Sequence, residues 1–353
     1  MSTRKHILGI DGLRGLSALM VVLFHLKVRG FALGWAGVQF FFVISGYLIT
    51  KILIHSREMY RDNIFKYLKV FYMKRTLRIF PLYYLYLIIA IAVAIIVHRP
   101  IGDAWQFFLY IQNYTLGLNH FNTQLVLGHT WSLAVEEQFY LLWPLLVWVT
   151  SSRHLFKLSI GLIITSILSR LLILHFTQNP FLDFSTLFSN FDTLALGTLL
   201  AIYDDHQVFV RLRIPAFLIS TLLLLISIYS IGYSKLWTPV QWTFTGFGPF
   251  FLSILGFFFF TLLMVILHAP QWLLSWIDKP PIAFIGKISY GIYIYHSMVI
   301  IVVNKAVTWA LYPANGPIAN VIVSFVSITL TIFLSWLSYR YFEQKFLRLK
   351  RET

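Results

Sequence analysis

The sequence predicts an all-α membrane protein, a polytopic helical bundle of about ten transmembrane helices within a single domain, residues 1–353. Of its 353 residues, 58% are hydrophobic and only 12% are charged, whereas a soluble globular domain carries about 25% charged residues. The apolar residues form runs of roughly 20, long enough to cross a hydrocarbon core of about 30 Å. Runs such as "FFLSILGFFFFTLLMVILH" lack the apolar–polar alternation of barrel strands, so they favour helices.

The apolar runs give ten predicted spans, and the basic residues set their orientation. The spans are residues 8–27, 36–54, 78–97, 131–150, 157–176, 187–203, 214–232, 245–267, 287–304 and 318–339. With the N-terminus inside, most lysines and arginines fall in inner loops and tails, and the outer loops hold only Lys27, Arg29, Arg99, Lys235 and Lys305. Because basic residues concentrate in cytoplasmic loops, we expect both termini in the cytoplasm. The net charge of +15 then reflects topology, and no nucleic-acid partner is expected.

Two connections are longer than a turn requires. The inner stretch "HSREMYRDNIFKYLKVFYMKR" repeats Ile64, Leu68 and Phe71 at helical spacing, which predicts an amphipathic helix lying in the membrane interface. The outer connection, residues 98–130, carries "WQFFLYIQNYTLG", which is short and polar enough to be interfacial or re-entrant. The glycines of "GWAGVQFFFVISG" in the second span indicate close helix packing.

The sequence offers little for metal or thiol chemistry. It contains no cysteine, which excludes disulfides, thiolate ligands and a thiol nucleophile. It also lacks a phosphate-binding glycine loop, a cluster of metal ligands and a GxSxG nucleophile motif. We expect no metal and no permanently bound cofactor. The first apolar run lacks a small-residue cleavage site, and we expect it to be retained as a span.

Two ionisable residues share the first span, "GLRGLSALMVVLFH". Arg14 and His25 are eleven residues apart, so they point to one side of a helix, separated by roughly 16 Å along its axis. Ionisable residues within spans usually face the protein interior or a watery cavity. The alternatives are that Arg14 snorkels to the inner surface and that His25 is a polar tip at the outer interface.

The fourth span opens at the outer face with "HTWSLAVEEQFYLLWP". Glu136 and Glu137 lie one to two turns inside it, at about the expected depth of His25. A carboxylate beside an imidazole stabilises the imidazolium, which makes the histidine a usable general base. Adjacent helical residues point about 100° apart, so only one glutamate is expected to face the site. The alternative is a structural pair of the carboxylate with Arg170 or another residue.

At the inner face, "MKRTLRIFP" places Arg75 and Arg78 one turn apart, with Lys74 beside them. Guanidinium groups in this arrangement suit phosphates, which they bind with paired hydrogen bonds. The alternative is that these charges only set topology. Further polar residues within the spans are candidates for the site or for structural roles: Ser132, Asp192, Tyr293 and His296.

Seven stretches, in this order, resemble the acyltransferase-three family of bacterial integral-membrane O-acyltransferases, over essentially the whole chain. They are "IDGLRGLSALMVVLFH", "GVQFFFVISGYLIT", "RTLRIFPLYYLY", "HTWSLAVEEQFYLLWP", "FDTLALGTLLA", "GKISYGIYIYH" and "SYRYFEQKFLR". Each stretch alone is a weak indication, whereas the ordered set is specific.

The resemblance implies transfer of an acyl group, usually acetyl, from cytoplasmic acyl-CoA to a hydroxyl of a sugar or another acceptor. By position, the essential arginine and histidine of the family's first span correspond to Arg14 and His25. Its inner-face arginine pair corresponds to Arg75 and Arg78, and its conserved WSL-motif glutamate to Glu136. Many members carry a C-terminal esterase-like domain that is missing here, so we expect the stand-alone type.

The resemblance therefore implies a multi-pass protein of the bacterial inner (cytoplasmic) membrane, with acetyl-CoA or another acyl-CoA as co-substrate. The expected partners are membrane lipids and a hydroxyl-bearing glycan, lipid-linked or free, such as lipopolysaccharide O-antigen. A lipo-oligosaccharide or a small glycosylated metabolite is the alternative acceptor. We expect the CoA phosphates on Arg75 and Arg78, the pantetheine arm passing Arg14, and the thioester near His25, within one continuous cavity. Direct transfer and a transient acyl-His both remain open, as does the oligomeric state.

Two other classes compete with this interpretation. Ionisable residues within spans also mark transport paths, which would suit a transporter of acyl or glycan groups. Transporters often contain internal repeats and paired broken helices, and the sequence has neither. A receptor or scaffold without chemistry would leave the Arg14, His25 and Glu136 set unexplained.

Overall fold

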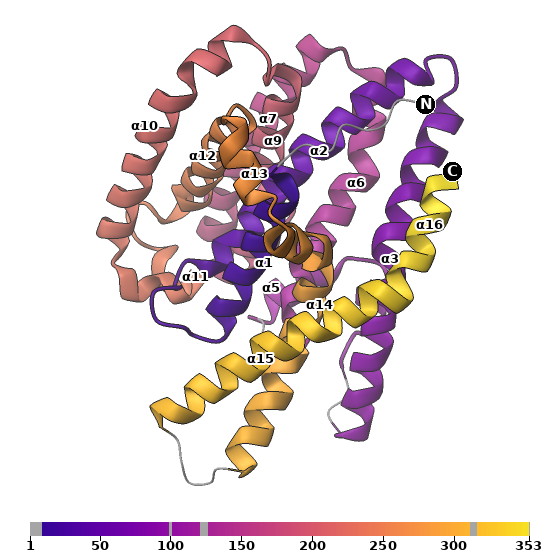
Figure 1. Ribbon diagram of the computed structural model, residues 1–353. Coiled ribbons are helices and arrows are strands. Elements are labelled where there is room, and N and C mark those ends of the chain that lie inside the picture. Colours follow the sequence, from indigo (N-terminus) through magenta and orange to yellow (C-terminus); the bar gives the residue numbers. More distant parts are fainter. Residues whose placement is uncertain (1–8, 99–100, 121–125, 311–315, 353) are drawn as a thin grey trace.

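The chain is helical throughout the part that the structure describes. The computed structural model describes residues 9–98, 101–120, 126–310 and 316–352 (Figure 1), which form helices joined by turns, with no strand among them. The all-α prediction is therefore confirmed. Residue 8, where the first predicted span begins, and Arg99, which we assign to an outer loop, lie outside the described residues.

Seven helices of the described chain are long and apolar enough to cross a membrane, so this is a multi-pass membrane protein. They are Gly34–Met59, which contains η1 (Gly34–Ala36) and α2 (Gly37–Met59); α3 (Ile64–Ile96); α7 (Ser152–Thr177); α10 (Gln207–Ile231); α12 (Gly248–Leu267); α14 (Pro280–Ala310); and Ile318–Leu349. The last belongs to α15 (Pro317–Ser338), which continues through the π-helical turn η5 (Tyr339–Glu343) into α16 (Gln344–Glu352). Each of the seven overlaps a predicted span.

Three predicted spans coincide with helices that are too short or too polar to be counted as membrane-spanning by length and composition. Helix α1 (Ile10–His25) has 16 residues and α9 (Phe191–Tyr203) has 13, fewer than the roughly 20 that cross a hydrocarbon core. Helix α6 (Trp131–Val149) is 19 residues long, but two glutamates and a glutamine lower its apolar character. The count of ten spans stays a prediction.

The stretch that was predicted to form an interfacial helix does not form a separate helix, because Ile64, Leu68 and Phe71 belong to α3. Asn63 caps α3, because its side chain accepts a hydrogen bond from the backbone N–H of Lys66 at 2.8 Å. Helix α3 then runs for 33 residues, or about 50 Å, with no break between this cap and the predicted span. Neither proline nor glycine occurs between Ile64 and Arg78, so nothing in the sequence ends the helix there.

The remaining connections are short helices and turns. In the predicted outer connection after α3, the structure has α4 (Trp105–Phe108), α5 (Gln112–Leu118) and η2 (Gly128–Thr130), so the described residues of this connection contain no full span. The other short elements are α8 (Pro180–Ser185), η3 (Phe188–Asn190), η4 (Tyr233–Trp237), α11 (Pro239–Trp242) and α13 (Gln271–Ile277).

The helices that surround the site approach one another at glycines. A Cβ atom added to Gly46 of α2 would collide with the carbonyl oxygen of Leu194 of α9, and one added to Gly197 would collide with that of Val43. Helices α1 and α14 meet in the same way, where Gly286 faces the carbonyl of Asp11. Small residues allow such close backbone packing, and the prediction from the second-span glycines is confirmed.

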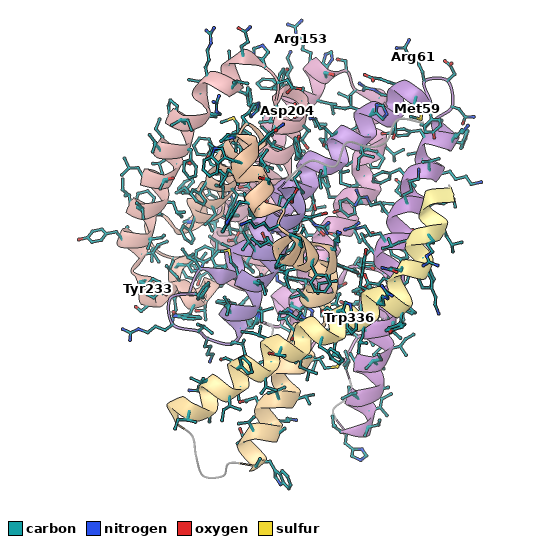
Figure 2. All side chains as sticks on the ribbon, viewed as in Figure 1. Met59, Arg61, Arg153, Asp204, Tyr233 and Trp336 are labelled. Atoms are coloured by element: carbon teal, nitrogen blue, oxygen red, sulfur yellow. The ribbon has the colours of Figure 1, made fainter. Side chains whose placement is uncertain are left out.

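The two ends of the bundle carry residues from opposite sets of predicted loops. Figure 2 shows Met59, Arg61, Arg153 and Asp204 toward one end, and Tyr233 toward the other. Arg61 and Arg153 belong to predicted inner loops, whereas Tyr233 belongs to a predicted outer loop. Helix α15 crosses α14 and leads to α16, which packs beside α3 toward the Arg61 end (Figure 1).

We predict that Gly197→Ala destabilises the protein. The new methyl group would meet the α2 backbone at Val43, so α2 and α9 must separate, and overpacking of this kind costs about 1–3 kcal/mol. The thermal unfolding midpoint in detergent should fall by several degrees. The control is Gly161→Ala, because nothing lies within 4 Å of a Cβ at that exposed glycine of α7. Equal midpoints for the two variants would contradict the packing argument.

Candidate active site

A large cavity lies inside the bundle, between α1, α2, α3, α6 and α14. Its volume is about 570 Å³. Along α2 the lining extends from Val38 to Ser56, which corresponds to about 27 Å of helix. Ser56 lies within one turn of Met59, which Figure 2 places at the same end of the bundle as Arg61 and Arg153. The cavity is therefore long, narrow and directed toward the end that carries the predicted inner loops.

The charged side chains that line this cavity are mainly cationic: Arg14, Lys51, Arg75 and Arg78 against Asp11 and Glu136. Lys51 forms an ion pair with Asp204, which is not part of the lining. The described part of the chain provides no salt bridge to Arg14, Arg75 or Arg78. The Arg75 guanidinium instead lies over the ring of Tyr140, 5.3 Å from its centroid. A cavity with this lining is suited to an anionic ligand.

One of the two adjacent glutamates faces the cavity. Glu136 lines it and accepts a hydrogen bond from Ser45 Oγ at 2.5 Å, while the Tyr140 hydroxyl donates to the same Ser45 oxygen at 3.0 Å. Glu137 is not among the lining residues, and its Oε1 is buried without a hydrogen-bond partner. Lys74 is also outside the lining. The α6 carboxylate that can act on a ligand in the cavity is therefore that of Glu136.

Two hydroxyl groups, those of Ser132 and Tyr293, line the cavity on the side of His129, and we call this hydrogen-bonded pair the closure. The Tyr293 hydroxyl of α14 donates to the backbone carbonyl of His129 at 2.7 Å. Its single proton is used in this bond, so the phenol oxygen accepts from Ser132 Oγ, at 2.6 Å. Both side chains line the cavity, whereas His129 lies behind them.

His25 lies beyond this closure and is exposed. Its Nδ1 is 2.9 Å from the carbonyl oxygen of Val21. A carbonyl only accepts hydrogen bonds, so Nδ1 carries the proton and a neutral His25 presents the Nε2 lone pair. This tautomer is the one that a general base at Nε2 requires.

The expectation of one continuous cavity from Arg14 to His25 is wrong for this structure. Arg14 lines the cavity but His25 does not. Between them, Ala18 and Val22 of α1 are buried against Ile288 and Ile292 of α14, so side chains fill the space along that face of α1.

The expected backing of His25 by Glu136 is also absent, since the two side chains have different hydrogen-bond partners. Glu136 lies in the second turn of α6, seven residues after His129 of η2. It lines the cavity, whereas His25 does not.

The rings nearest to His25 belong to Phe24 and to His296 of α14, whose centroid is 4.9 Å away. His296 is fully buried, and its ring is 4.8 Å from that of His129. The imidazoles of His25, His296 and His129 thus form a row, which we call the imidazole row. The sequence analysis missed His129, although its position directly before the "TWSL" stretch was a usable signal. It also missed Lys51, which lines the cavity.

Asp192 belongs to a different cluster. It forms a buried ion pair with Arg170 at 2.9 Å and accepts a hydrogen bond from Ser253 Oγ at 2.6 Å. Arg170 also donates to the carbonyl oxygens of Pro249 and Ser189. Neither charged residue lines the cavity. Arg170 therefore pairs with Asp192 and not with Glu136, and its role is structural.

The predicted site residues fall into three groups. Those that line the cavity are Arg14, Arg75, Arg78, Ser132, Glu136 and Tyr293. Those in the imidazole row are His25 and His296. Those outside both are Lys74, Glu137 and Asp192. No group of three or more His, Asp or Glu side chains in the described ranges is arranged to hold a metal ion.

The comparisons with known proteins identify the family. A family profile described as "Acyltransferase domain" matches residues 7–340, and the chain belongs to this acyltransferase family. It is 30% identical over 368 residues to the O-acetyltransferase OatA of Staphylococcus aureus strains NCTC 8325 / PS 47 and COL, which covers 97% of this chain and 57% of each relative. The chain thus spans little more than half the length of these relatives. No solved structure matches it.

We predict that Asp192→Ala lowers stability without acting through the cavity. The change leaves the Arg170 charge buried without its counter-ion, and breaking a buried pair in this way costs about 3–5 kcal/mol. The unfolding midpoint in detergent should fall markedly, whereas the control Asp205→Ala, at an exposed carboxylate near the end of the same helix, should leave it unchanged. A stable Asp192→Ala protein would refute the structural role.

Proposed function

We propose that the protein is a membrane O-acyltransferase of the bacterial inner membrane. It moves an acyl group, most simply acetyl, from cytoplasmic acyl-CoA to a hydroxyl of a cell-envelope glycan such as lipopolysaccharide O-antigen. One observation carries the proposal: a long cation-lined cavity from the Arg61 end of the bundle stops at hydroxyls beside the imidazole row. Membership of an acyltransferase family and the names of the OatA relatives support the reaction class.

The donor half of the proposal rests on charge and length. Acyl-CoA combines a phosphorylated nucleotide with a thin pantetheine arm, and Arg75 and Arg78 face the cavity without a salt bridge in the described chain. Guanidinium groups bind phosphate with paired, charge-assisted hydrogen bonds. About 27 Å of cavity length along α2 accommodates the arm, so the thioester would reach the Ser132 and Tyr293 end.

The acceptor half rests on His25. It is exposed on the far side of the closure, with Nε2 as the basic nitrogen. In the proposed step, His25 removes the proton of the acceptor hydroxyl while the oxygen attacks the thioester carbonyl carbon. The imidazolium then returns this proton to the sulfur of the departing CoA thiolate. Direct transfer needs no covalent enzyme intermediate, and we propose it as the simpler path.

Arg14 and Glu136 act as positioning residues in this scheme. Both line the cavity between the phosphate end and the closure. Arg14 can donate hydrogen bonds to the amide carbonyls of the pantetheine arm, and Glu136 can accept from its amide N–H groups. Such contacts would fix the position of the pantetheine arm and thus of its thioester, and accurate placement of reactants contributes strongly to catalysis.

A single assay separates the competing functions. Inside-out vesicles are made from cells in which the chromosomal gene is deleted and the protein is expressed from a plasmid, and labelled acetyl-CoA is added outside. The proposal predicts release of free CoA and base-labile label on glycan in the lumen. A transporter would move label inward without CoA release, and a scaffold would do neither. Mass analysis of the labelled glycan then distinguishes O-antigen from a lipo-oligosaccharide or a small glycosylated metabolite.

We predict that His25→Ala reduces transfer about 10²- to 10⁴-fold, the usual contribution of one general base. The protein should still fold, because His25 is exposed and bonded only to its own helix. The matched control is His175→Ala, an exposed histidine in the last turn of α7, as His25 is in the last turn of α1. Near-wild-type labelling by a well-expressed His25→Ala protein would exclude His25 as the base.

We predict that Arg75→Ala and Arg78→Ala each raise the KM for acetyl-CoA roughly tenfold to a hundredfold with little change in kcat. Each variant loses a charge-assisted contact of about 1.5–3 kcal/mol, far from the reacting carbon. Arg211→Ala serves as control, because this exposed arginine belongs to a predicted inner loop and does not line the cavity. An unchanged KM with a collapsed kcat would contradict the assigned role.

A further inference from the structure

Three buried nitrogen atoms of the imidazole row form no hydrogen bond of normal geometry in the described structure. They are Nδ1 and Nε2 of His129 and Nε2 of His296. His129 is only 6% exposed and His296 is fully buried. Buried polar atoms in folded proteins nearly always have a partner, and each exception requires an explanation. A cluster of three such atoms indicates that a polar group from outside the chain enters this place.

The cluster lies where the two substrates of the proposed reaction would meet. The His129 ring is 5.4 Å from the ring of Tyr293, whose hydroxyl closes the cavity. On the other side, His296 separates His129 from the exposed His25, at 4.8 and 4.9 Å between ring centroids. His129 is thus the imidazole that lies directly behind the closed end of the donor cavity.

Two features make His129 a hydrogen-bond donor to a developing negative charge. Burial and the neighbouring His25 lower the pKa of His129 to about 3, so the ring is neutral at physiological pH and carries one N–H. His129 also lies two residues before Trp131, the first residue of the 19-residue helix α6. The N-terminus of a helix carries a partial positive charge and favours an anion.

We propose that the His129 imidazole N–H binds the carbonyl oxygen of the thioester and stabilises the oxyanion that forms there. This inference rests on the proposed function and deepens it. The acceptor oxygen bonds to the carbonyl carbon, its proton passes to His25 Nε2, and the carbonyl electron pair moves onto the oxygen held by His129. The carbonyl then re-forms, the carbon–sulfur bond breaks, and His25 returns the proton to the CoA thiolate.

The same geometry assigns a task to Tyr293. Its hydroxyl is hydrogen-bonded to the His129 carbonyl and to Ser132, and it stands between the cavity and the His129 ring. For the thioester to reach His129, the Tyr293 side chain must leave this position. The phenol therefore separates the donor cavity from the imidazole row until a donor displaces it.

The test compares substitutions of His129 that keep or remove the side-chain N–H. Inside-out vesicles carry the full protein and their own envelope glycans, acetyl-CoA is the varied substrate, and base-labile label per protein gives kcat and KM. His129→Leu and His129→Met lack a donor and should lose roughly 10²- to 10³-fold in kcat, as when one oxyanion donor is removed. KM for acetyl-CoA should change less than about threefold. His129→Gln retains an N–H and should keep most of the activity that the other two lose.

The control is His268→Leu, a half-buried histidine outside the cavity and the row, whose Nδ1 bonds the carbonyl oxygen of Met264. A kcat of His129→Leu within tenfold of wild type would overturn the inference. If His129→Leu does not fold, the Gln and Met variants decide, and equal kcat for these two would overturn it. No transfer by the wild-type protein would instead overturn the proposed function, so the two failures are distinguishable.

Discussion

A charge inside a bilayer must find either a counter-ion or water, and this constraint divides the charged residues of the bundle into two kinds. Arg170 and Asp192 satisfy each other completely, with further bonds to Ser253 and backbone carbonyls. Arg75 and Arg78 face a cavity of about 570 Å³ and have no salt bridge in the described chain. The first kind stabilises the fold, whereas the second gives the cavity a positive potential that favours an anionic ligand.

Close backbone contacts at glycines help to hold the helices that form the walls of this cavity. Gly46 and Gly197 bring α2 against α9, and Gly286 brings α14 against α1. These contacts fix the helices that carry Ser45, Arg14 and Tyr293, so the polar lining is preorganised. Preorganised polar groups act more strongly on a ligand because they need not rearrange when it binds.

The sequence predicted the elements better than the relations between them. Helical spacing placed Arg75 beside Arg78, and the cost of charge in lipid pointed to Arg14 and Glu136; all four line one cavity. Depth within the bundle was less predictable, because it depends on how the helices shift against one another and not only on where each begins, and the predicted start of the fourth span agrees with that of α6. For this reason Glu136 was expected beside His25, where the structure places the ring of His296, with His129 next to it.

Partners across helices were not predictable either. The pairing of Arg170 with Asp192 and the continuity of α3 through its basic stretch depend on packing that no local pattern records. The closure formed by Tyr293 illustrates what packing adds. Under the proposed function, an acyl group would pass through the bundle without a pore being opened, so a barrier between donor and acceptor would be required. Two neutral hydrogen bonds, worth about 1 kcal/mol each, hold the Tyr293 side chain between the cavity and the imidazole row. Contacts of this strength are weak enough for a bound thioester to displace.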